Sequence, residues 1–542
     1  MTSIAAVPTP DRIVGEPRWL KNSLHLTPGR DPLGFQTITI DQIMPSLLPG
    51  VLALSRRARY FSFYPFLLHE YQERRMASNN NALSEFVRSR EFEYAAAVQL
   101  CPHGCGRLPT ALIGKEKAGP AVRRSQDSLD RDFSVDSFLG GYGLYYRSPL
   151  SDLRLIARAG TPLGDRPTSV DVLLGDRAVK LALAFKAAIS DSDYYRNHMY
   201  DPEPIPVAVL QELGERACLC RLTETYEERN LIRDALLRPA DGVPPVEVNR
   251  RHQAFSLFLR LLERDPRVAI NDMVFRSAIW EEFERTHQER TARASGVARW
   301  AALVAKEYLQ EGFSSIWSHI CRLGYQMQGP KGLDREDLAR LVRSQLIQPT
   351  PLEFQGEAIH VDLRMPTSAF EAAALEAARS YSLEELRAWA SQTDTALAGM
   401  TLLFVLYRRL LHMGDLPNGW GEVALQHSDH QPGLAVLGRL LRQHIDESPT
   451  LADTFSWLVH RYVLDTHETI AYSRLPNNVF RFRWEQGRLR FFDNGLERFV
   501  IPDNRRDALA RISEDLGFWK RTQNGDITLT EDGARLVAEA VA

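Results

Sequence analysis

The chain has 542 residues, several times the length of an average domain, so we expect more than one packed unit. Its 66 basic and 69 acidic residues leave a formal charge of -3, which excludes proteins that adhere to nucleic acid through a strong overall positive field. Five cysteines in so long a chain exclude a disulfide-rich secreted fold. The composition is that of an ordinary globular protein.

Residues 1–50 are rich in Pro and Gly, which predicts an irregular N-terminal arm. Met1–Pro28 lacks a positive segment followed by an apolar one, so we predict no signal peptide. The longest apolar run, Ala396–Tyr407, is shorter than the roughly 18 to 20 residues that cross a bilayer. We therefore expect a cytoplasmic protein with no membrane association.

From the sequence of residues 51–240 we predict an α-rich domain with a small β element. Apolar side chains on most faces of Ser55–Arg75 predict a buried helix that either kinks or restarts at Pro65. A second helix over Ala82–Leu100 follows three asparagines, any of which can cap it. Later in this segment we predict a strand at Val170–Leu174 and a helix at Asp176–Ile189.

Residues 241–420 predict a helical middle domain, because apolar positions recur at three- and four-residue spacing. The Gly- and Pro-rich loop Gly414–Gly433 then marks a domain boundary. The predicted helices are Asn249–Glu263, Asp272–Thr286, Ser295–Cys321, Arg335–Leu346, Thr367–Ser380 and Leu383–Met413.

From the sequence of residues 421–542 we predict a C-terminal domain that contains a β-hairpin. Aromatic and charged residues alternate over Val479–Glu485, and the turn Gln486-Gly487 leads into Arg488–Phe492. Alternation of this kind is typical of a strand with one packed face and one solvated face.

A helix capped by Asp503, a hairpin around Asn524-Gly525 and a terminal helix to Ala540 end the chain. This order resembles winged-helix domains, which bind DNA in some proteins and dimerise in others. The sequence therefore predicts a mainly α, multidomain fold with small β-hairpins and a C-terminal winged-helix-like module.

Basic residues are frequent in the C-terminal domain. Arginines on a strand face can contact phosphates while the other face packs. The alternative is a solvated face that nearby acidic residues such as Glu485 and Asp493 neutralise. The candidate DNA contacts are Arg481, Arg483, Arg488, Arg490, Arg505, Arg506, Lys520 and Arg521.

Two cysteine pairs are candidates for a metal site. Cys101-Pro-His103-Gly-Cys105 offers two thiols and an imidazole, and Cys218-Leu-Cys220 offers two more thiols. Zinc usually takes four such ligands, spaced two to four residues apart within a pair. The first spacing fits and the second is tighter than usual. Since spacing cannot show whether the pairs meet, and buried free cysteines are common, we predict no cofactor and leave zinc as the alternative.

Catalytic candidates are fewer. Asp171, Asp176 and Lys180 resemble the acidic and lysine residues of a restriction-type nuclease core, but the spacing is wrong for that core. The alternative is a surface ion pair between Asp176 and Lys180 on one helix. His427-Ser-Asp-His430 brings two imidazoles and a carboxylate together, although the sequence favours a polar surface loop over a hydrolase site here.

Two glycine-rich segments, Gly114–Lys117 and Gly140–Gly143, are candidates for a phosphate cradle. Neither has the spacing of a P-loop or the strand and helix context of a dinucleotide site. The tyrosines around Gly140–Gly143 can stack on a base, and a tight turn packed by those tyrosines is the alternative.

Three groups of residues resemble a group of large bacterial proteins encoded in anti-phage defence islands. They are Asp31–Gly34 with Leu47–Gly50 and Arg59–Tyr64; Gly140–Tyr146; and Ala182–Ala188 leading to Asp193–Tyr195. The resemblance implies a component of a multi-gene defence or DNA-processing system and carries over no catalytic residue.

We therefore expect a non-enzymatic component that binds the other proteins of such a system or double-stranded DNA. The alternatives are a metal-dependent nuclease or related hydrolase, and a transcriptional regulator whose long helical body acts as a sensor.

Overall fold

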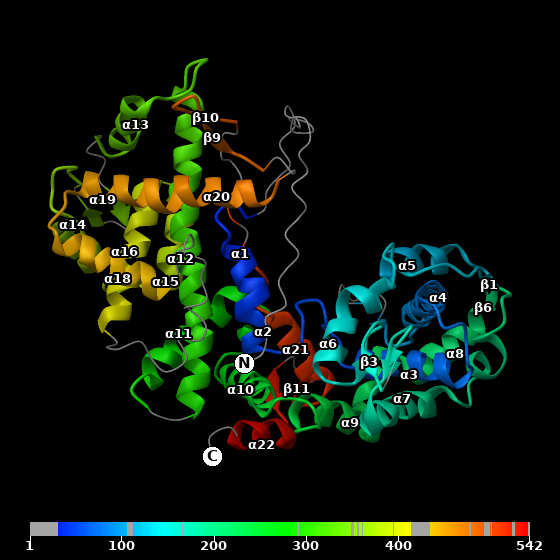
Figure 1. Cartoon of the computed structure of the whole chain (residues 1–542). Helices are drawn as coiled ribbons and strands as arrows, with labels where there is room; N and C mark the ends of the chain where they lie inside the picture. Colours follow the sequence, from blue (N-terminus) through cyan, green and yellow to red (C-terminus); the bar gives the residue numbers. More distant parts are fainter. Residues whose placement is uncertain are drawn as a thin grey trace. The chain divides into compact units, whose positions relative to one another are not determined.

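The computed structural model describes residues 31–105, 112–164, 166–289, 292–347, 352–354, 357–359, 361–393, 395–412, 434–475, 479–492, 499, 501–522 and 526–539. In these parts the protein is mainly helical, as predicted, and its strands form six two-stranded antiparallel sheets (Figure 1). No helix among the described residues is long and apolar enough to cross a membrane.

Contacts divide the chain into two compact units that are each built from distant segments. Unit 1 consists of Met1–Gln36, Tyr308–Arg409 and His427–Ile501, and unit 2 of Thr37–Glu307, Leu410–Gln426 and Pro502–Ala542. The predicted boundaries near residues 50, 240 and 420 cut the chain differently and stay a prediction.

The prediction of an irregular arm does not hold for residues 35–47, which form short helices. They are α1 (Phe35–Ile38), η1 (Thr39–Ile43) and α2 (Met44–Leu47). Met44 and Leu47 are buried, and Pro45 is tolerated because the first turn of a helix leaves its N–H groups unpaired. The Pro and Gly content of this segment predicted an irregular structure, but the burial of Met44 and Leu47 favours short helices.

The first long helices of unit 2 are α3 (Tyr60–Glu73) and α4 (Asn80–Gln99). Pro65 lies inside α3, which continues through it as one helix and is buried along most of its length. The predicted asparagine cap is confirmed, since the Asn79 side chain accepts a hydrogen bond of 2.9 Å from the Ala82 N–H.

The remainder of unit 2 alternates helices with short strand pairs. The predicted strand and helix at Val170–Ile189 are confirmed as β5 and α7. The helices are α5 (Lys115–Arg124), η3 (Tyr142–Tyr146), α6 (Arg147–Asp152), α7 (Gly175–Ile189), η4 (Tyr194–His198), α8 (Val207–Ala217), η5 (Leu219–Thr223), α9 (Tyr226–Leu237), α10 (Pro245–Arg264), η6 (Pro266–Ala269) and α11 (Asp272–Thr286). The strand pairs are β1 (Ser128–Leu129) with β6 (Ile205–Pro206), β2 (Ile156–Ala157) with β5 (Val172–Leu173), and β3 (Pro162–Leu163) with β4 (Arg166–Pro167).

Aromatic residues from three of the segments that carry the family resemblance pack together in the core of unit 2. The ring centroids of Tyr60 and Tyr146 are 5.1 Å apart, and those of Phe63 and Phe185 are 5.3 Å apart. Edge and tilted contacts at such distances stabilise a core beyond the burial of area alone. These residues therefore have a packing role.

Unit 1 is largely helical. It includes the second half of α12 (Ala292–Met327), α13 (Arg335–Ile347), β7 (Leu352–Phe354), β8 (Glu357–Ile359), α14 (Thr367–Ala377), α15 (Leu383–Thr393), α16 (Ala396–His412), α18 (Leu434–Asp446), α19 (Leu451–Leu458), η7 (Val459–Leu464) and α20 (Asp465–Ser473). The predicted single helix over Leu383–Met413 is wrong, because α15 ends at Thr393 and α16 begins at Ala396. The Thr395 hydroxyl accepts a hydrogen bond from the Ala398 N–H and so favours a new helix start.

Both predicted C-terminal hairpins are present. In unit 1, β9 (Phe482–Glu485) pairs with β10 (Arg488–Phe491) across Gln486 and Gly487, whose φ angles of 51° and 78° are those of a type I′ turn. In unit 2, β11 (Trp519–Arg521) pairs with β12 (Ile527–Leu529). The Asn524-Gly525 turn lies outside the described residues.

Two helices flank the second hairpin, namely α21 (Arg506–Asp515) and α22 (Glu531–Glu539). The predicted cap at Asp503 is wrong, because Arg505 occupies the N-cap position with φ of 59°. Asp503 instead accepts a hydrogen bond of 2.6 Å from the Arg505 N–H and thereby stabilises the left-handed backbone conformation of Arg505.

Candidate metal centre

Four cysteines from two distant segments meet in unit 2. Their sulfur atoms all lie within 4.8 Å of one another. Cys101 Sγ and Cys220 Sγ are 3.8 Å apart, although 119 residues separate them in the chain. We call this group the cysteine centre: Cys101, Cys105, Cys218 and Cys220.

A turn after α4 places the first pair. The Gly104 N–H donates to the Cys101 carbonyl at 3.0 Å, and this bond turns the chain back so that Cys105 lies beside Cys101. Gly104 has φ of 71°, a conformation that glycine adopts without strain. A Cβ at this glycine would contact nothing within 4 Å, so the backbone angle alone accounts for glycine here.

The end of α8 places the second pair. Cys218 follows the helix with ψ of 152°, which ends the helical path and starts η5, where Cys220 lies. A Cβ on Gly214 would lie 2.3 Å from the Ala97 carbonyl oxygen, so only glycine lets α8 approach α4 this closely. The Tyr94 hydroxyl of α4 donates to the Ala217 carbonyl at 2.7 Å and holds the same helix ends together.

The cysteine centre is partly enclosed, and hydrogen bonds between its thiols shift their pKa values. Cys101 and Cys218 are buried, whereas Cys105 and Cys220 are half-buried. Hydrogen bonds from the Cys218 and Cys220 thiols hold the pKa of Cys105 well below its usual range. The same hydrogen bonds to Cys105 raise the pKa values of Cys218 and Cys220.

His103 lies at the exposed rim of the centre. Its Nδ1 atom is 3.9 Å from Cys101 Sγ and 3.7 Å from Cys220 Sγ. The imidazole can therefore contact two of the sulfurs, while the four thiols by themselves form the convergent group.

The distances between the sulfur atoms of the cysteine centre can be compared with those in a tetrahedral metal site. Metal–sulfur bonds of about 2.3 Å in a tetrahedron place neighbouring sulfurs about 3.8 Å apart. A disulfide requires about 2.05 Å between sulfurs, and all five cysteines are free. The arrangement thus has the shape of a four-thiolate site for one soft metal ion.

Residues 57–59 connect the cysteine centre to the C-terminal module. Arg59 Nη1 donates to the Cys218 carbonyl at 2.7 Å, and its guanidinium forms a buried ion pair with Glu228 at 2.8 Å. Arg57 donates two hydrogen bonds to Asp515 at the end of α21, at 2.8 and 2.9 Å. The Ala58 N–H donates to the same carboxylate.

The predicted catalytic residues do not form a metal site. Asp171 is buried and accepts hydrogen bonds from Arg147, Tyr142 and the Ala159 N–H. Burial would raise the pKa of Asp171, but these bonds, led by that of Arg147, lower it. Asp176 and Lys180 are exposed on α7.

Among the described residues, the cysteine centre is the one group of three or more Cys, His, Asp or Glu side chains close enough to hold a metal ion. His427 and His430 lie outside the described residues.

The glycine-rich candidate for a phosphate cradle already holds an anionic group of the protein. Glu91 is buried, and its carboxylate accepts hydrogen bonds from the Gly141 N–H at 2.9 Å and the Tyr142 N–H at 2.6 Å. Burial raises the pKa of this carboxyl group. A Cβ on Gly141 would lie 2.1 Å from the Ile113 side chain, so close packing explains the glycine.

The second glycine-rich candidate, Gly114–Lys117, forms the start of α5 and borders a cavity of about 640 Å³. The Lys117 ammonium lies 2.6 Å from Asp136, so an internal carboxylate already neutralises it.

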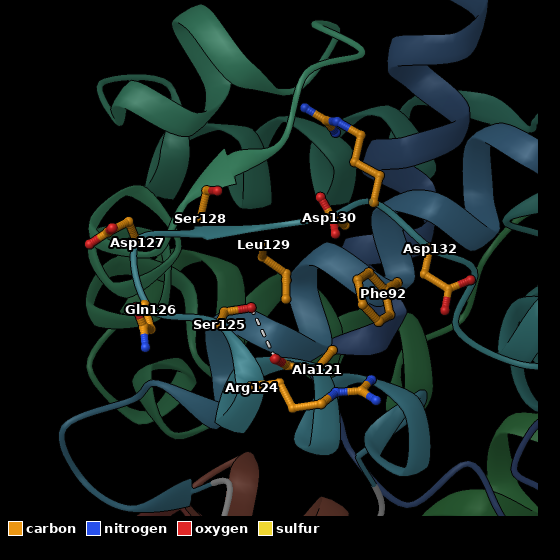
Figure 2. Close-up of a pocket in the computed structure, with 11 residues that line it drawn as sticks. Phe92, Ala121, Arg124, Ser125, Gln126, Asp127, Ser128, Leu129, Asp130 and Asp132 are labelled. Atoms are coloured by element: carbon orange, nitrogen blue, oxygen red, sulfur yellow. Dashed lines mark hydrogen bonds between the residues drawn. The ribbon is translucent and has the colours of Figure 1, made fainter.

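A further cavity of about 560 Å³ lies between α4, α5 and the segment that includes β1 (Figure 2). Ser125 donates to the Ala121 carbonyl at 2.9 Å on its wall. Its three carboxylates, Asp127, Asp130 and Asp132, do not belong to any metal-binding group found among the described residues.

The predicted DNA contacts fall into two sets in different units. Arg481, Arg483, Arg488 and Arg490 belong to unit 1, and Arg505, Arg506, Lys520 and Arg521 to unit 2. Arg481, Arg505 and Arg506 are buried, whereas Arg490, Lys520 and Arg521 are exposed.

The buried arginines of unit 2 already have partners. Arg505 donates to the Met44 and Leu48 carbonyls at 3.1 and 2.7 Å, and Arg506 pairs with Asp272 at 2.7 Å. In unit 1, Glu485 pairs with both Arg483 and Arg490. Arg488 lies 3.5 Å from Asp334.

Comparison with protein-family models, curated proteins and solved structures gives no match to this chain. The geometry of the cysteine centre and of the C-terminal module is therefore the basis for a functional proposal.

Proposed function

We propose that the protein is a non-enzymatic binding component of a bacterial anti-phage defence or DNA-processing complex. In this proposal its C-terminal winged-helix-like module contacts double-stranded DNA or a partner subunit. The observation that carries the proposal is the pair of exposed cations, Lys520 and Arg521, on strand β11 of that module.

The order of elements supports a winged-helix-like module. Helix α21, the hairpin β11–β12 and helix α22 follow one another, and the hairpin is in the place of a wing. The Trp519 Nε1–H donates to the Ala510 carbonyl at 3.1 Å and ties the hairpin to α21. The Thr530 hydroxyl donates to the Gly517 carbonyl at 2.7 Å and ties the second strand to the start of the first.

The charges of the module divide into two roles. Arg505 and Arg506 are buried, where they bind carbonyls and a carboxylate of unit 2. Lys520 and Arg521 are exposed to solvent, and the Arg521 guanidinium lies 4.0 Å from the Glu514 carboxylate. Exposed cations on a strand suit contacts to phosphate groups.

The chemistry of the cysteine centre is compatible with a binding protein. Four thiolates around one ion leave no open position for a substrate or an activated water, which is typical of architectural metal sites. The resemblance to defence-island proteins supplies the biological setting.

A salt-dependent titration against duplex DNA tests the proposal. The Lys520→Ala/Arg521→Ala variant should bind more weakly, and the slope of log affinity against log salt should fall by about 1 for each cation that contacts a phosphate. Lys180→Ala/Arg196→Ala is a matched control, because it removes two exposed charges of unit 2 away from the hairpin. Equal losses in both variants would rule out a specific role for the hairpin.

Failure of the wild-type protein to bind duplex DNA at low salt would eliminate the DNA arm. The partner arm predicts co-purification with products of neighbouring genes and a shift in elution on size exclusion. A monomeric profile in their presence, together with no DNA binding, would overturn the whole proposal.

A further inference from the structure

We propose that Cys101, Cys105, Cys218 and Cys220 bind one zinc ion that joins the ends of α4 and α8. This inference is independent of the proposed function, because it depends on the geometry of the cysteine centre alone. The four sulfurs converge to within 4.8 Å of one another, although they come from segments more than a hundred residues apart.

The number and distances of the ligands indicate a single ion. The 3.8 Å between Cys101 Sγ and Cys220 Sγ matches the sulfur–sulfur edge of about 3.8 Å in a zinc–thiolate tetrahedron. A cluster of several irons and sulfides would need the thiolates spread around a larger body. Hard cations such as magnesium prefer oxygen ligands, so the soft sulfur set favours zinc.

The surroundings suit a zinc–tetrathiolate group, which carries a net charge of -2 once each thiol has released its proton. Arg59, which is paired with Glu228, donates a hydrogen bond to the carbonyl of Cys218 beside the centre. His103, with Nδ1 within 3.7 to 3.9 Å of two sulfurs, can donate an N–H to a thiolate. Donors of this kind orient and stabilise zinc-bound ligands.

Zinc would act here as a structural crosslink. Four protein ligands close the coordination sphere, and they join the turn after α4 to the start of η5. Since η5 packs against α21, the crosslink also stabilises the surface on which the C-terminal module lies.

Metal analysis of the purified full-length protein is the first test. We expect about one zinc per chain by mass spectrometry of the metal, and X-ray absorption with four sulfur neighbours at about 2.3 Å. Cys105→Ser and Cys220→Ser should each lose most of the zinc. Cys321→Ser is the matched control, because Cys321 is a buried cysteine that forms no disulfide and lies outside the centre, so this variant should keep full zinc occupancy.

Cobalt substitution keeps the inference testable if the serine variants fail to fold. The wild-type protein, stripped of metal and reloaded with cobalt(II), should show the strong near-ultraviolet absorption of a four-thiolate site. His103→Ala should retain both the zinc and this absorption, because the imidazole lies at the rim.

Chelation of the wild-type protein should lower its melting temperature by about 5 °C or more. Three results would each overturn the inference: a protein without zinc and without the cobalt band, an equimolar content of iron or copper in place of zinc, or equal metal loss in Cys321→Ser.

Discussion

The cysteine centre and the β9–β10 hairpin differ in how the charges of their side chains are balanced. In the hairpin, Glu485 forms ion pairs with both Arg483 and Arg490, so the strand pair includes a counter-charge of its own. In the cysteine centre, four groups that become anionic on ionisation converge, and the nearby Arg59 is already paired with Glu228. A group of charged side chains that includes both signs needs no added ion. A group of side chains that carry the same negative charge is stabilised when a cation binds to it.

The largest effect on the stability of the protein is expected at the contact between α4 and α8. Gly214→Ala places a Cβ 2.3 Å from the Ala97 carbonyl, so the helices must separate. We expect a loss of about 2–3 kcal/mol in the free energy of unfolding, typical of overpacking, and reduced zinc occupancy. Chemical denaturation and metal analysis measure the two effects.

Gly329→Ala is the control for this variant, because a Cβ at Gly329 would meet nothing within 4 Å. Full stability and full zinc content in Gly214→Ala would show that the close helix contact does not organise the centre.

The buried histidine beside the β9–β10 hairpin is expected to make the free energy of unfolding depend on pH. His467 Nε2 accepts from the Arg481 N–H at 3.0 Å, and its Nδ1 lies 3.1 Å from the Pro32 carbonyl oxygen, so the ring fits as a neutral imidazole. Burial lowers the pKa of His467 to about 3. Because the unfolded chain binds this proton near pH 6.5 and the folded chain does not, stability falls as pH falls between these values.

The expected slope from His467 alone is about 1.4 kcal/mol per pH unit below pH 6.5. Urea denaturation of the wild type and of His467→Gln at several pH values measures it. Parallel pH curves for the two proteins would contradict the assignment of the acid sensitivity to this side chain.

The smallest effect is expected at the hairpin itself. Glu485→Gln leaves Arg483 and Arg490 without their shared carboxylate, whose pKa they lower, Arg483 more than Arg490. The stability should change by less than about 1 kcal/mol, since partly exposed ion pairs contribute little. A loss above about 3 kcal/mol in thermal or urea denaturation would mean that the hairpin charges are structurally essential.

Local patterns predicted several of the long helices and both C-terminal hairpins. Apolar spacing located α11 and α13, and the Gln486-Gly487 turn located the β9–β10 hairpin. The break between α15 and α16 was missed, because a single threonine cap interrupts a continuous apolar pattern.

The candidate site depended on tertiary structure and was therefore harder to predict. The spacing of Cys101 and Cys105 indicated a half-site, but only the close packing at Gly214 brings Cys218 and Cys220 to it. Likewise, nothing local distinguishes the buried Arg505 from exposed Arg521, since the partners of Arg505 are carbonyls more than 450 residues away.

The bond between Arg57 and Asp515 spans 458 residues and affects how the protein is synthesised. A ribosome releases Arg57 long before Asp515, so most of unit 2 emerges while one of its surfaces still lacks α21. Nascent chains stopped before residue 502 lack α21 and would expose the parts of α10, η5 and η6 that α21 contacts. Unit 2 is thus completed only after α21 has left the ribosome, and chaperones have a defined surface to protect until then.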